Sequence, residues 1–449
     1  MSNLPRVLIF GQPFNSKSGG GITLSNLFRE WDKDKVAVAA TGHVMHNLTT
    51  DICDTYYQLG SNEFIWRFPF NYIQRKFKSG LLKLDTQLPI NHVRRKSTLR
   101  YIAVNRFFYP VLEWAGLLHN AARIRNSENF RQWLKNYKPE LLYFQVSSLD
   151  TIVFARELKD YLAIPAVIHM MDDWPSTIGK RGPFGRFWSR KIDGELRLLF
   201  DKTDLFLSIS EAMSAEYKRK YSKDFLPFHN PIDIHLWGKY SKRDYSFNGD
   251  TVKVLYSGRI GQGISSSLLE IAAAIDKLNT EGLTIRFHIQ SPVSEPSVIR
   301  QLLSYKCIVI NKIVEYSKLP EIYSGADLLV IANDFDEKAI SFLKYSMPTK
   351  ASEYMISGTP VLVYSHGETA VSKFFMQFNC GYCVTEHNES QLITSLKLLV
   401  NNQEYRKQLG ATAVRVASEL FDGEQKRNEF RELLIRTYQR NDKQINSEN

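Results

Sequence analysis

Long apolar runs are absent from this sequence of 449 residues. Nowhere do eighteen apolar residues follow one another, which is about the length a helix needs to cross a bilayer. The N-terminus, Met1–Arg6 followed directly by the apolar run Val7–Phe10, lacks the successive charged, apolar and cleavage regions of a secretory signal peptide. We therefore expect a cytoplasmic protein.

Cysteine is scarce, with four in the whole chain. So few cysteines in a long chain do not form a disulfide scaffold, which agrees with a reducing compartment. The run Cys380-Gly-Tyr-Cys383 has the spacing of a metal or redox pair, but no second pair and no histidine cluster accompanies it. We interpret it as an ordinary loop and the start of a strand.

Internal repeats and low-complexity segments are also lacking, and the chain is longer than one hydrophobic core usually supports. Alternating strand and helix patterns instead predict an α/β protein with one doubly wound sheet in each half. The first half has strand candidates at residues 6–10, 36–40, 141–145, 166–170 and 204–209. The second half has them at residues 252–256, 283–289, 308–310, 327–331 and 359–364.

The polar segment Gly238–Asp250 has no hydrophobic periodicity, so we expect it to link the two halves. We expect a first domain over residues 1–240, a second over 250–420, and a C-terminal helix with a polar tail over 421–449. A ligand should lie in the cleft between the two domains, because open parallel sheets bind ligands at the carboxyl ends of their strands.

The net charge of +11 predicts an acidic partner. Many cations fall in an insertion near residues 62–131, interleaved with aromatic residues and few acids. Such a composition suits attachment to an anionic membrane surface, and a solvated charged face over an ordinary core is an equal alternative. Nucleic acid binding is not expected, because no nucleic-acid module is present. The cations are Arg67, Arg75, Lys76, Lys78, Lys83, Arg94, Arg95, Lys96, Arg100, Arg106, Arg123, Arg125 and Arg131.

The most informative segment, Met347–Tyr364, joins the start of a helix to a buried strand. Pro348 suits the first turn of a helix, where its missing N–H costs nothing. Lys350 is unexpected there, because a cation in the first turn opposes the helix dipole by roughly 0.3–1 kcal/mol. An anion between Lys350 and the helix start would remove this conflict. Glu353 follows on the same face, and the pattern indicates a site for a nucleotide diphosphate.

This segment resembles the donor site of retaining, family 4 type glycosyltransferases of the GT-B fold. The run Glu353-Tyr-Met-Ile-Ser-Gly-Thr-Pro-Val is similar to the second half of the family's signature, Glu-Ala-Met-Ala-x-Gly-x-Pro-Val. The resemblance implies that Glu353 accepts hydrogen bonds from the ribose hydroxyls, and that the loop with Pro348 and Thr349 contacts sugar and diphosphate. Tyr345 stands where the family has its first glutamate. A solvated helix glutamate is the simpler interpretation of Glu353.

A second element, Gly258-Arg259-Ile-Gly-Gln262-Gly, closes the first strand of the second half. It resembles the family's Gly-Arg pair followed by Lys-Gly, whose two cations neutralise the departing diphosphate. Arg259 is present, whereas Gln262 stands near the place of the usual lysine. We expect Lys350 to supply the missing positive charge from the other loop.

Two glycine-containing loops also match the family. The loop Gly19-Gly20-Gly21 follows the first strand and opens a helix, so its backbone can approach an anion closely. It resembles the family's loop that reaches the donor phosphate and the acceptor, and a purely structural turn is the alternative. Gly367 and Glu368 open the helix after the strand that ends at residue 364, where we expect contacts with the donor.

His169 and Asp172 follow an apolar strand in the first half, in the run His-Met-Met-Asp-Asp-Trp-Pro. This run resembles a pattern of the family's bacterial polysaccharide branch, in which the histidine faces the transferred sugar. A histidine held in the core is the alternative. Asp172 could orient the acceptor hydroxyl or take its proton, and capping a helix is the alternative.

The run Asp334-Phe-Asp336 has the spelling of a metal-binding motif of the other glycosyltransferase fold, but it follows a strand in a half that should neutralise diphosphate with cations. We expect a solvated loop there, with no required metal or cofactor.

Together these features predict the GT-B fold, with two Rossmann-like domains facing across a cleft, and a retaining glycosyltransferase. The donor would be a nucleotide diphosphate sugar and the acceptor a glycan or lipid-linked glycan made for a surface polysaccharide at the inner face of the cytoplasmic membrane. The alternative is a non-catalytic relative that binds nucleotide or assists a partner transferase. The sequence does not identify the donor's base or sugar.

Overall fold

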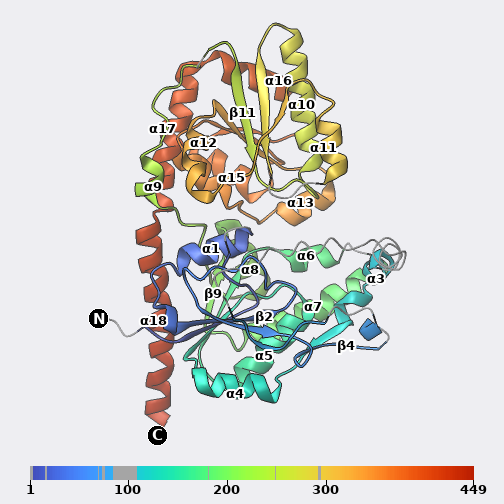
Figure 1. Ribbon diagram of the computed structural model, residues 1–449, viewed down its shortest axis with the longest axis vertical. Coiled ribbons are helices and arrows are strands. Elements are labelled where there is room, and N and C mark those ends of the chain that lie inside the picture. The colour runs from blue at the N-terminus through green and yellow to red at the C-terminus, as the bar shows by residue number, and fades with distance from the viewer. Residues whose placement is uncertain are drawn as a thin grey trace. The chain divides into compact units, whose positions relative to one another are not determined.

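The computed structural model describes residues 4–15, 18–68, 70–72, 76–83, 109–179, 182–247, 249–291 and 295–448. The chain forms two compact units, shown in Figure 1. Unit 1 comprises Met1–Ser208, Ser214–Leu226 and Asn428–Asn449, and unit 2 comprises Ile209–Met213 and Pro227–Arg427.

Unit 1 is built on an eight-stranded sheet with the order β10-β9-β8-β7-β1-β2-β3-β5. Strands β9, β8, β7, β1, β2 and β3 pair in parallel, and β5 pairs with β3 in the antiparallel sense. The strands are β1 Val7–Phe10, β2 Val36–Thr41, β3 Thr55–Leu59, β5 Gly80–Leu81, β7 Leu141–Phe144, β8 Ala166–Met170, β9 Leu205–Ser208 and β10 Phe225–Pro227. A separate antiparallel pair joins β4 Phe64–Trp66 to β6 Ala122–Ile124.

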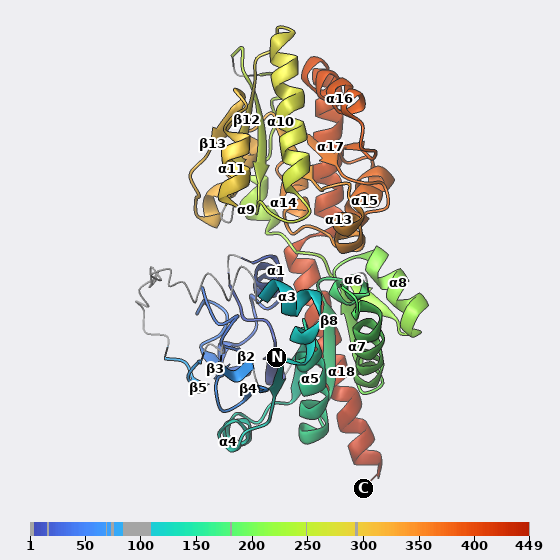
Figure 2. The same ribbon diagram turned by 90° about the vertical axis from the view of Figure 1, so that its right-hand side faces the viewer.

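Helices cover both faces of this sheet (Figures 1 and 2). On one face the ring of Tyr143 packs against Phe28, next to α1, and against Phe430 of α18. On the other face Phe10 packs against Phe154 of α5. The helices are α1 Gly19–Leu27, α3 Tyr109–Trp114, α4 Glu128–Tyr137, α5 Leu149–Leu162, α6 Trp174–Ile178, α7 Gly185–Phe200, α8 Glu211–Tyr221 and α18 Gly423–Glu448, with short 3-10 helices η1 Lys33–Lys35, η2 Phe70–Tyr72 and η4 Leu117–Asn120.

Unit 2 contains a six-stranded, wholly parallel sheet with the order β13-β12-β11-β14-β15-β16. Its apolar core includes Val254 and Phe287 of the sheet and Leu268 and Leu396 of the covering helices. The strands are β11 Val252–Ser257, β12 Ile285–Gln290, β13 Ile308–Ile310, β14 Leu328–Ala332, β15 Val361–Tyr364 and β16 Tyr382–Val384. The helices are α9 Ile234–Gly238, α10 Ser265–Thr280, α11 Pro296–Leu302, η5 Tyr316–Lys318, α12 Leu319–Ser324, α13 Glu337–Leu343, α14 Lys350–Ile356, α15 Ala370–Phe378, α16 Glu389–Asn401 and α17 Gln403–Leu420.

All ten predicted strands are present, each within two residues of the predicted bounds. The interpretation of Cys380–Cys383 as a loop leading into a strand is confirmed, because β16 begins at Tyr382. Sequence patterns missed the short strands β3, β4, β5, β6 and β10, since runs of two to five residues give too few positions to show a period.

The segment Gly238–Asp250, expected to be a linker, belongs to unit 2. The amide of Lys242 donates to the carbonyl oxygen of Ser357 at 2.8 Å, and the Tyr245 hydroxyl donates to Gly358 O at 3.1 Å. The buried guanidinium of Arg406 donates to Tyr245 O at 2.7 Å. Hydrogen bonds to the backbone, which a polar sequence does not reveal, fix this segment.

The C-terminal stretch contains two helices, α17 and α18, and α18 continues to Glu448 through most of the segment expected to be a polar tail. The reason is compositional, because residues 424–448 contain neither glycine nor proline to end a helix.

In the described part of the chain, no helix is both long and apolar enough to cross a membrane. Much of the basic aromatic insertion, residues 73–75 and 84–108 among it, lies outside the described residues.

Candidate functional site

The end of strand β11 and the start of helix α14 meet in unit 2 through a set of tyrosines. The Tyr354 hydroxyl accepts a hydrogen bond from the amide of Ser257 at 2.9 Å, and the Tyr323 hydroxyl donates to Ser257 Oγ at 3.0 Å. The hydroxyl of Tyr256 donates to the carbonyl oxygen of Arg259 at 2.6 Å. These bonds fix the turn that leads from β11 to Arg259.

Lys350, the first residue of α14, lies over the face of Tyr256, with 3.8 Å between its Nζ and the ring centroid. Gly258 makes this approach possible. A Cβ atom there would lie 3.1 Å from Lys350 Nζ and 3.2 Å from the Tyr256 hydroxyl. The glycine of the predicted Gly-Arg pair therefore brings the lysine close to the turn that carries Arg259.

Lys350 and Arg259 form a cationic site at this turn. Burial and, to a smaller degree, the positive charge of Arg259 lower the pKa of Lys350 to about 7, against the opposing effect of Glu353. Arg259 is exposed and donates from Nη1 to the carbonyl oxygen of Gln262 at 3.3 Å. Within the described ranges, neither cation has a carboxylate partner within 4.0 Å. An anion between them would stabilise both charges.

Glu353 lies one turn further along α14 and is only 4 % exposed. Its Oε1 accepts a hydrogen bond of 2.9 Å from the Tyr316 hydroxyl. Burial raises the pKa of Glu353 to about 7, while the bond from Tyr316 and the charge of Lys350 act in the opposite direction. The solvated-glutamate interpretation is therefore wrong, and a buried carboxylate with few donors suits a ligand that brings hydroxyl groups.

The loop before α14 takes a different form from the one the sequence suggested. Helix α14 begins at Lys350, and Thr349 occupies its N-cap position without a side-chain cap bond. Pro348 lies just outside the helix. Asn230 Nδ2 donates to the Thr349 carbonyl oxygen at 3.4 Å, and Ser352 Oγ donates to Asn230 O at 3.1 Å, so this loop is held against the segment before α9.

Tyr345 and Glu368 are brought together through one lysine. The Nζ of Lys344 lies 3.0 Å from a carboxylate oxygen of Glu368 and 5.7 Å from the Tyr345 ring centroid. The ion pair holds the pKa of exposed Glu368 below its usual range. The amide of Gly367 donates to Thr385 O at 3.2 Å. That amide has an internal acceptor, whereas Glu368 remains at the surface.

The glycine loop of unit 1 opens α1 as predicted, but one of its backbone amides already donates a hydrogen bond inside the protein. Ser18 caps α1, because its Oγ accepts a hydrogen bond of 3.2 Å from the amide of Gly21. A Cβ at Gly21 would lie 2.2 Å from the Asn15 side chain, whereas one at Gly20 would lie 3.6 Å from the nearest atom, in Gln12. Gly21 therefore has a packing role, and Gly20 leaves more room.

His169 lies in the core of unit 1, at 1 % exposure, near the end of β8. The Tyr143 hydroxyl lies 2.5 Å from its Nδ1, and its Nε2 makes no hydrogen bond. Burial lowers the pKa of the imidazole to about 3, so the ring is neutral. These contacts favour the core interpretation over contact with a sugar. Asp172 is exposed, and its neighbour Asp173 is the residue that precedes α6 and accepts a 2.8 Å bond from the Tyr217 hydroxyl.

The Asp-Phe-Asp run lies in a loop, as expected, with Asp336 exposed, but Asp334 is buried and both aspartates cap helices. Asp334 is buried and accepts a hydrogen bond from the amide of Ser267 at 2.8 Å. Asp336 caps α13 by accepting from the amides of Lys338 and Ala339, each at 3.0 Å. Across the part of the chain that the structure describes, no three His, Cys, Asp or Glu side chains come together as a metal site would require.

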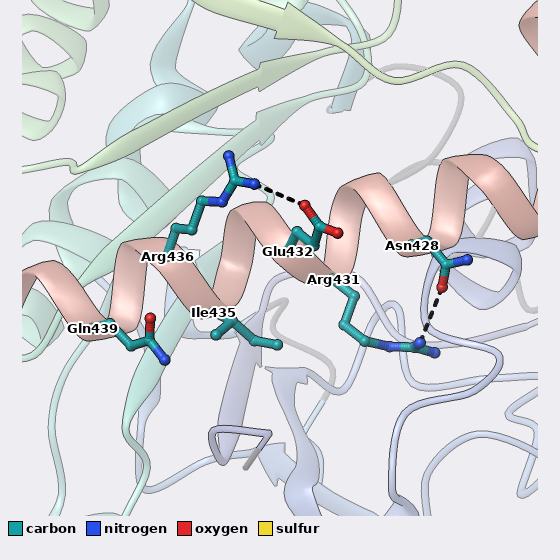
Figure 3. Close-up of a pocket in the computed structure, with 6 residues that line it drawn as sticks. All are labelled: Asn428, Arg431, Glu432, Ile435, Arg436 and Gln439. Atoms are coloured by element: carbon teal, nitrogen blue, oxygen red, sulfur yellow. Dashed lines mark hydrogen bonds and ion pairs between the residues drawn. The ribbon is translucent and has the colours of Figure 1, made fainter. Parts of the chain in front are cut away.

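A pocket on the surface of unit 1 lies along α18 and contains none of the predicted site residues (Figure 3). Its polar side chains bond to each other, Arg431 to Asn428 at 3.1 Å and Arg436 to Glu432 at 2.8 Å. Since one helix supplies the whole lining, we assign it no ligand. The lining residues are Asn428, Arg431, Glu432, Ile435, Arg436 and Gln439.

Several solved structures with this architecture are glycosyltransferases. HepE from Anabaena, in complex with UDP-glucose, is similar to the chain with a TM-score of 0.60 and 13% identity, over 96% of this chain and 99% of that one. Sucrose-phosphate synthase from Thermosynechococcus elongatus gives 0.60 and 12%, over 95% and 97%. A glycosyltransferase from Rickettsia africae gives 0.60 and 10%, over 96% and 98%.

The chain therefore has the GT-B fold, and the predicted α/β class is confirmed. At these identities the likeness establishes the fold alone. No protein-family model and no curated protein matches the sequence.

Lys350, Glu353 and Arg259 were predicted from the sequence, but the residues that position them were not. Tyr256, Tyr316, Tyr323 and Tyr354 all hold the candidate site, and each is an aromatic residue whose hydroxyl bonds inside unit 2. In a sequence, a tyrosine within an apolar run predicts only that its ring is buried. The hydrogen-bond partner of its hydroxyl becomes known only when the structure shows which loop lies next to it.

Proposed function

We propose that the protein is a glycosyltransferase that moves a sugar from a nucleotide diphosphate sugar to a hydroxyl group of an acceptor. The observation that carries this proposal is the cationic site of Lys350 and Arg259, which has no carboxylate within 4.0 Å among the described residues and lies one helical turn from the buried carboxylate of Glu353. The fold supports it, because several solved proteins of this architecture are glycosyltransferases.

In the proposed complex the diphosphate lies between Lys350 and Arg259, and the ribose hydroxyls donate to Glu353. The bond between the sugar and the diphosphate breaks, and the acceptor oxygen forms the new bond to the sugar. We propose the retaining course of family 4, in which the acceptor attacks from the face that the diphosphate leaves and its proton passes to a diphosphate oxygen. The two cations stabilise the charge that develops on the leaving group.

The remaining predicted residues have assigned places in this proposal. Tyr345, Pro348 and Thr349 lie in the loop before α14, and Gly258, Gly367 and Glu368 lie in neighbouring turns of unit 2, where they would surround the donor. In unit 1, Gly20 remains a candidate for approach to a ligand and Asp172 for orienting the acceptor. His169 has the surroundings of a core residue.

The acceptor we propose is a glycan or lipid-linked glycan of a surface polysaccharide. The donor's base is open. UDP-glucose is the first donor to test, because HepE is solved with it. A panel of UDP-, GDP-, ADP- and CMP-sugars in a thermal shift assay should show selective stabilisation by one class, since a ligand that binds only the folded state raises its stability by mass action.

The variant Lys350→Met should lower turnover, or the slow hydrolysis of the donor, by roughly 10²-fold or more, as for the loss of a fixed electrostatic stabiliser. Lys338→Met is a matched control, because Lys338 is an exposed lysine on α13 of the same unit. Near-normal turnover of Lys350→Met would refute the role of Lys350. Binding of a nucleotide sugar without turnover or hydrolysis would favour the alternative, a non-catalytic relative that assists a partner.

A further inference from the structure

Unit 1 exposes a cluster of large apolar side chains where α3, η4 and the start of α7 meet. Trp114 is 63 % exposed, Phe184 is 54 % and Phe187 is 57 %. Val111 and Leu117 are also exposed. Single exposed apolar residues are ordinary, but several together on one face mark a place where another surface binds. We call these five residues, with the cations described below, the α3–α7 surface.

Contacts beneath these side chains place α3, η4 and the start of α7 next to one another. A Cβ at Gly116, between α3 and η4, would lie 2.5 Å from the Trp188 indole, and the rings of His119 and Trp188 have centroids 5.4 Å apart. Gly182 approaches the carbonyl oxygen of Trp114 so closely that a Cβ there would overlap it. Figures 1 and 2 show α3 beside α7 in unit 1.

The same surface is positively charged. The segment 182–191 reads Gly-Pro-Phe-Gly-Arg-Phe-Trp-Ser-Arg-Lys and contains no acid, and its cations Arg186, Arg190 and Lys191 are all exposed. Among the residues that the structure describes, none of the three has a carboxylate within 4.0 Å. By contrast Arg197, further along α7, is paired with Asp193 at 3.0 Å. The unpaired cations are therefore confined to the end of α7 that carries the exposed aromatic rings.

We propose that the α3–α7 surface binds the headgroup region of an anionic lipid bilayer. Trp114, Phe184 and Phe187 would lie at the level of the headgroups, where aromatic rings are favoured, and Arg186, Arg190 and Lys191 would contact lipid phosphates. Charge complementarity selects this occupant, because the three exposed cations of α7 outnumber Glu113, the one exposed acid of α3, and suit a sheet of negative headgroups. The proposal is independent of the proposed function.

Membrane contact was expected from the sequence only for the insertion near residues 62–131, which includes Val111, Trp114 and Leu117. Phe184, Phe187 and their cations lie outside that segment, so α7 adds a second, separate element to the surface. Phe68 and Tyr72, in the described part of the insertion, are also exposed, and their rings pack with centroids 6.0 Å apart.

Sedimentation with vesicles tests the proposal on the full-length protein. Wild type should sediment with vesicles of phosphatidylcholine and phosphatidylglycerol, should not sediment with phosphatidylcholine alone, and should be released by salt. The double variant Phe184→Ser/Phe187→Ser and the triple variant Arg186→Gln/Arg190→Gln/Lys191→Gln should each weaken binding about tenfold or more. Lys312→Gln/Ile313→Ser is the matched control, since it changes an exposed cation and an exposed apolar residue in unit 2. It should bind as wild type does.

A second measurement does not depend on loss of binding. Lipids brominated on their chains should quench part of the tryptophan fluorescence of wild type, and Trp114→Phe should remove most of that quenching while still sedimenting. Failure of wild type to sediment, as expected if an acidic protein is the partner, would overturn the proposal. So would equal binding by the Phe184→Ser/Phe187→Ser variant with an unchanged melting temperature, or an equal loss in the control.

Discussion

Donor binding should change the number of bound protons, and the sign of that change should reverse near pH 7. In the free protein the pKa of Lys350 is lowered to about 7 and the pKa of Glu353 is raised to about 7. A diphosphate about 4 Å from Lys350 would favour its charged form by up to about 4 kcal/mol, which corresponds to roughly three pKa units. Ribose hydroxyls that donate to Glu353 would favour its ionised form and lower its pKa.

The two effects dominate at different pH values. Above pH 7 Glu353 is mostly ionised and Lys350 mostly neutral, so binding should take up protons. Below pH 7 Lys350 is mostly charged and Glu353 mostly protonated, so binding should release protons. A nucleotide sugar is the right ligand, because a terminal phosphate with a second pKa near 6 would add its own proton.

Isothermal titration calorimetry in buffers with different ionisation enthalpies gives the proton count directly. Lys350→Met should lose the uptake at pH 8 and keep the release at pH 6, and Glu353→Gln should show the reverse. Uptake that persists in Lys350→Met, or an equal proton count at both pH values in wild type, would refute the reasoning.

Three further predictions concern the residues that hold the site. The folded-state pKa of Lys350 is below its usual 10.5, so the free protein loses stability as pH falls from 10.5 toward 7. Lys350→Met removes this loss and should raise the melting temperature of the protein at pH 7 by a few degrees. An unchanged or lower melting temperature would contradict this. Tyr256→Leu should weaken donor binding roughly tenfold by removing the ring under Lys350, whereas Tyr256→Phe should keep most of the affinity in calorimetry, and equal losses in both would count against the ring contact. Gly21→Ala should lower the melting temperature, because its Cβ would lie 2.2 Å from Asn15, whereas Gly20→Ala should not, and similar melting temperatures for the two variants would show that the loop adjusts.

The strands of both sheets could be predicted well, because parallel strands buried on both faces consist of continuous apolar runs in the sequence. The runs around β1, β7 and β14 are such cases, and all of their residues are buried. The strands β3 and β16 were harder, because they mix polar and apolar positions over few residues.

The candidate site was predictable where a residue conflicts with its local surroundings. Lys350 at a helix start is such a conflict, and the structure adds a second one, since the ammonium lies in a poorly solvated place beside another cation. His169 was ambiguous, because a histidine at a strand end looks the same in a sequence whether it faces a ligand or bonds to Tyr143. Three of the tyrosine hydroxyls could not be assigned from the sequence, since their partners are distant in the chain: Ser257 for Tyr323 and Tyr354, and Glu353 for Tyr316.

The central claim is that Lys350 and Arg259 hold a diphosphate, and shortening the ligand tests it most directly. Dissociation constants should be measured at pH 7 for the nucleoside diphosphate and monophosphate of the preferred base, with wild type, Lys350→Met and Arg259→Gln. The account predicts that wild type loses roughly 10- to 100-fold in affinity with the second phosphate, as for charge-assisted hydrogen bonds, and that each variant loses much less. Equal affinity of wild type for both nucleotides, or an undiminished difference in the variants, would contradict it.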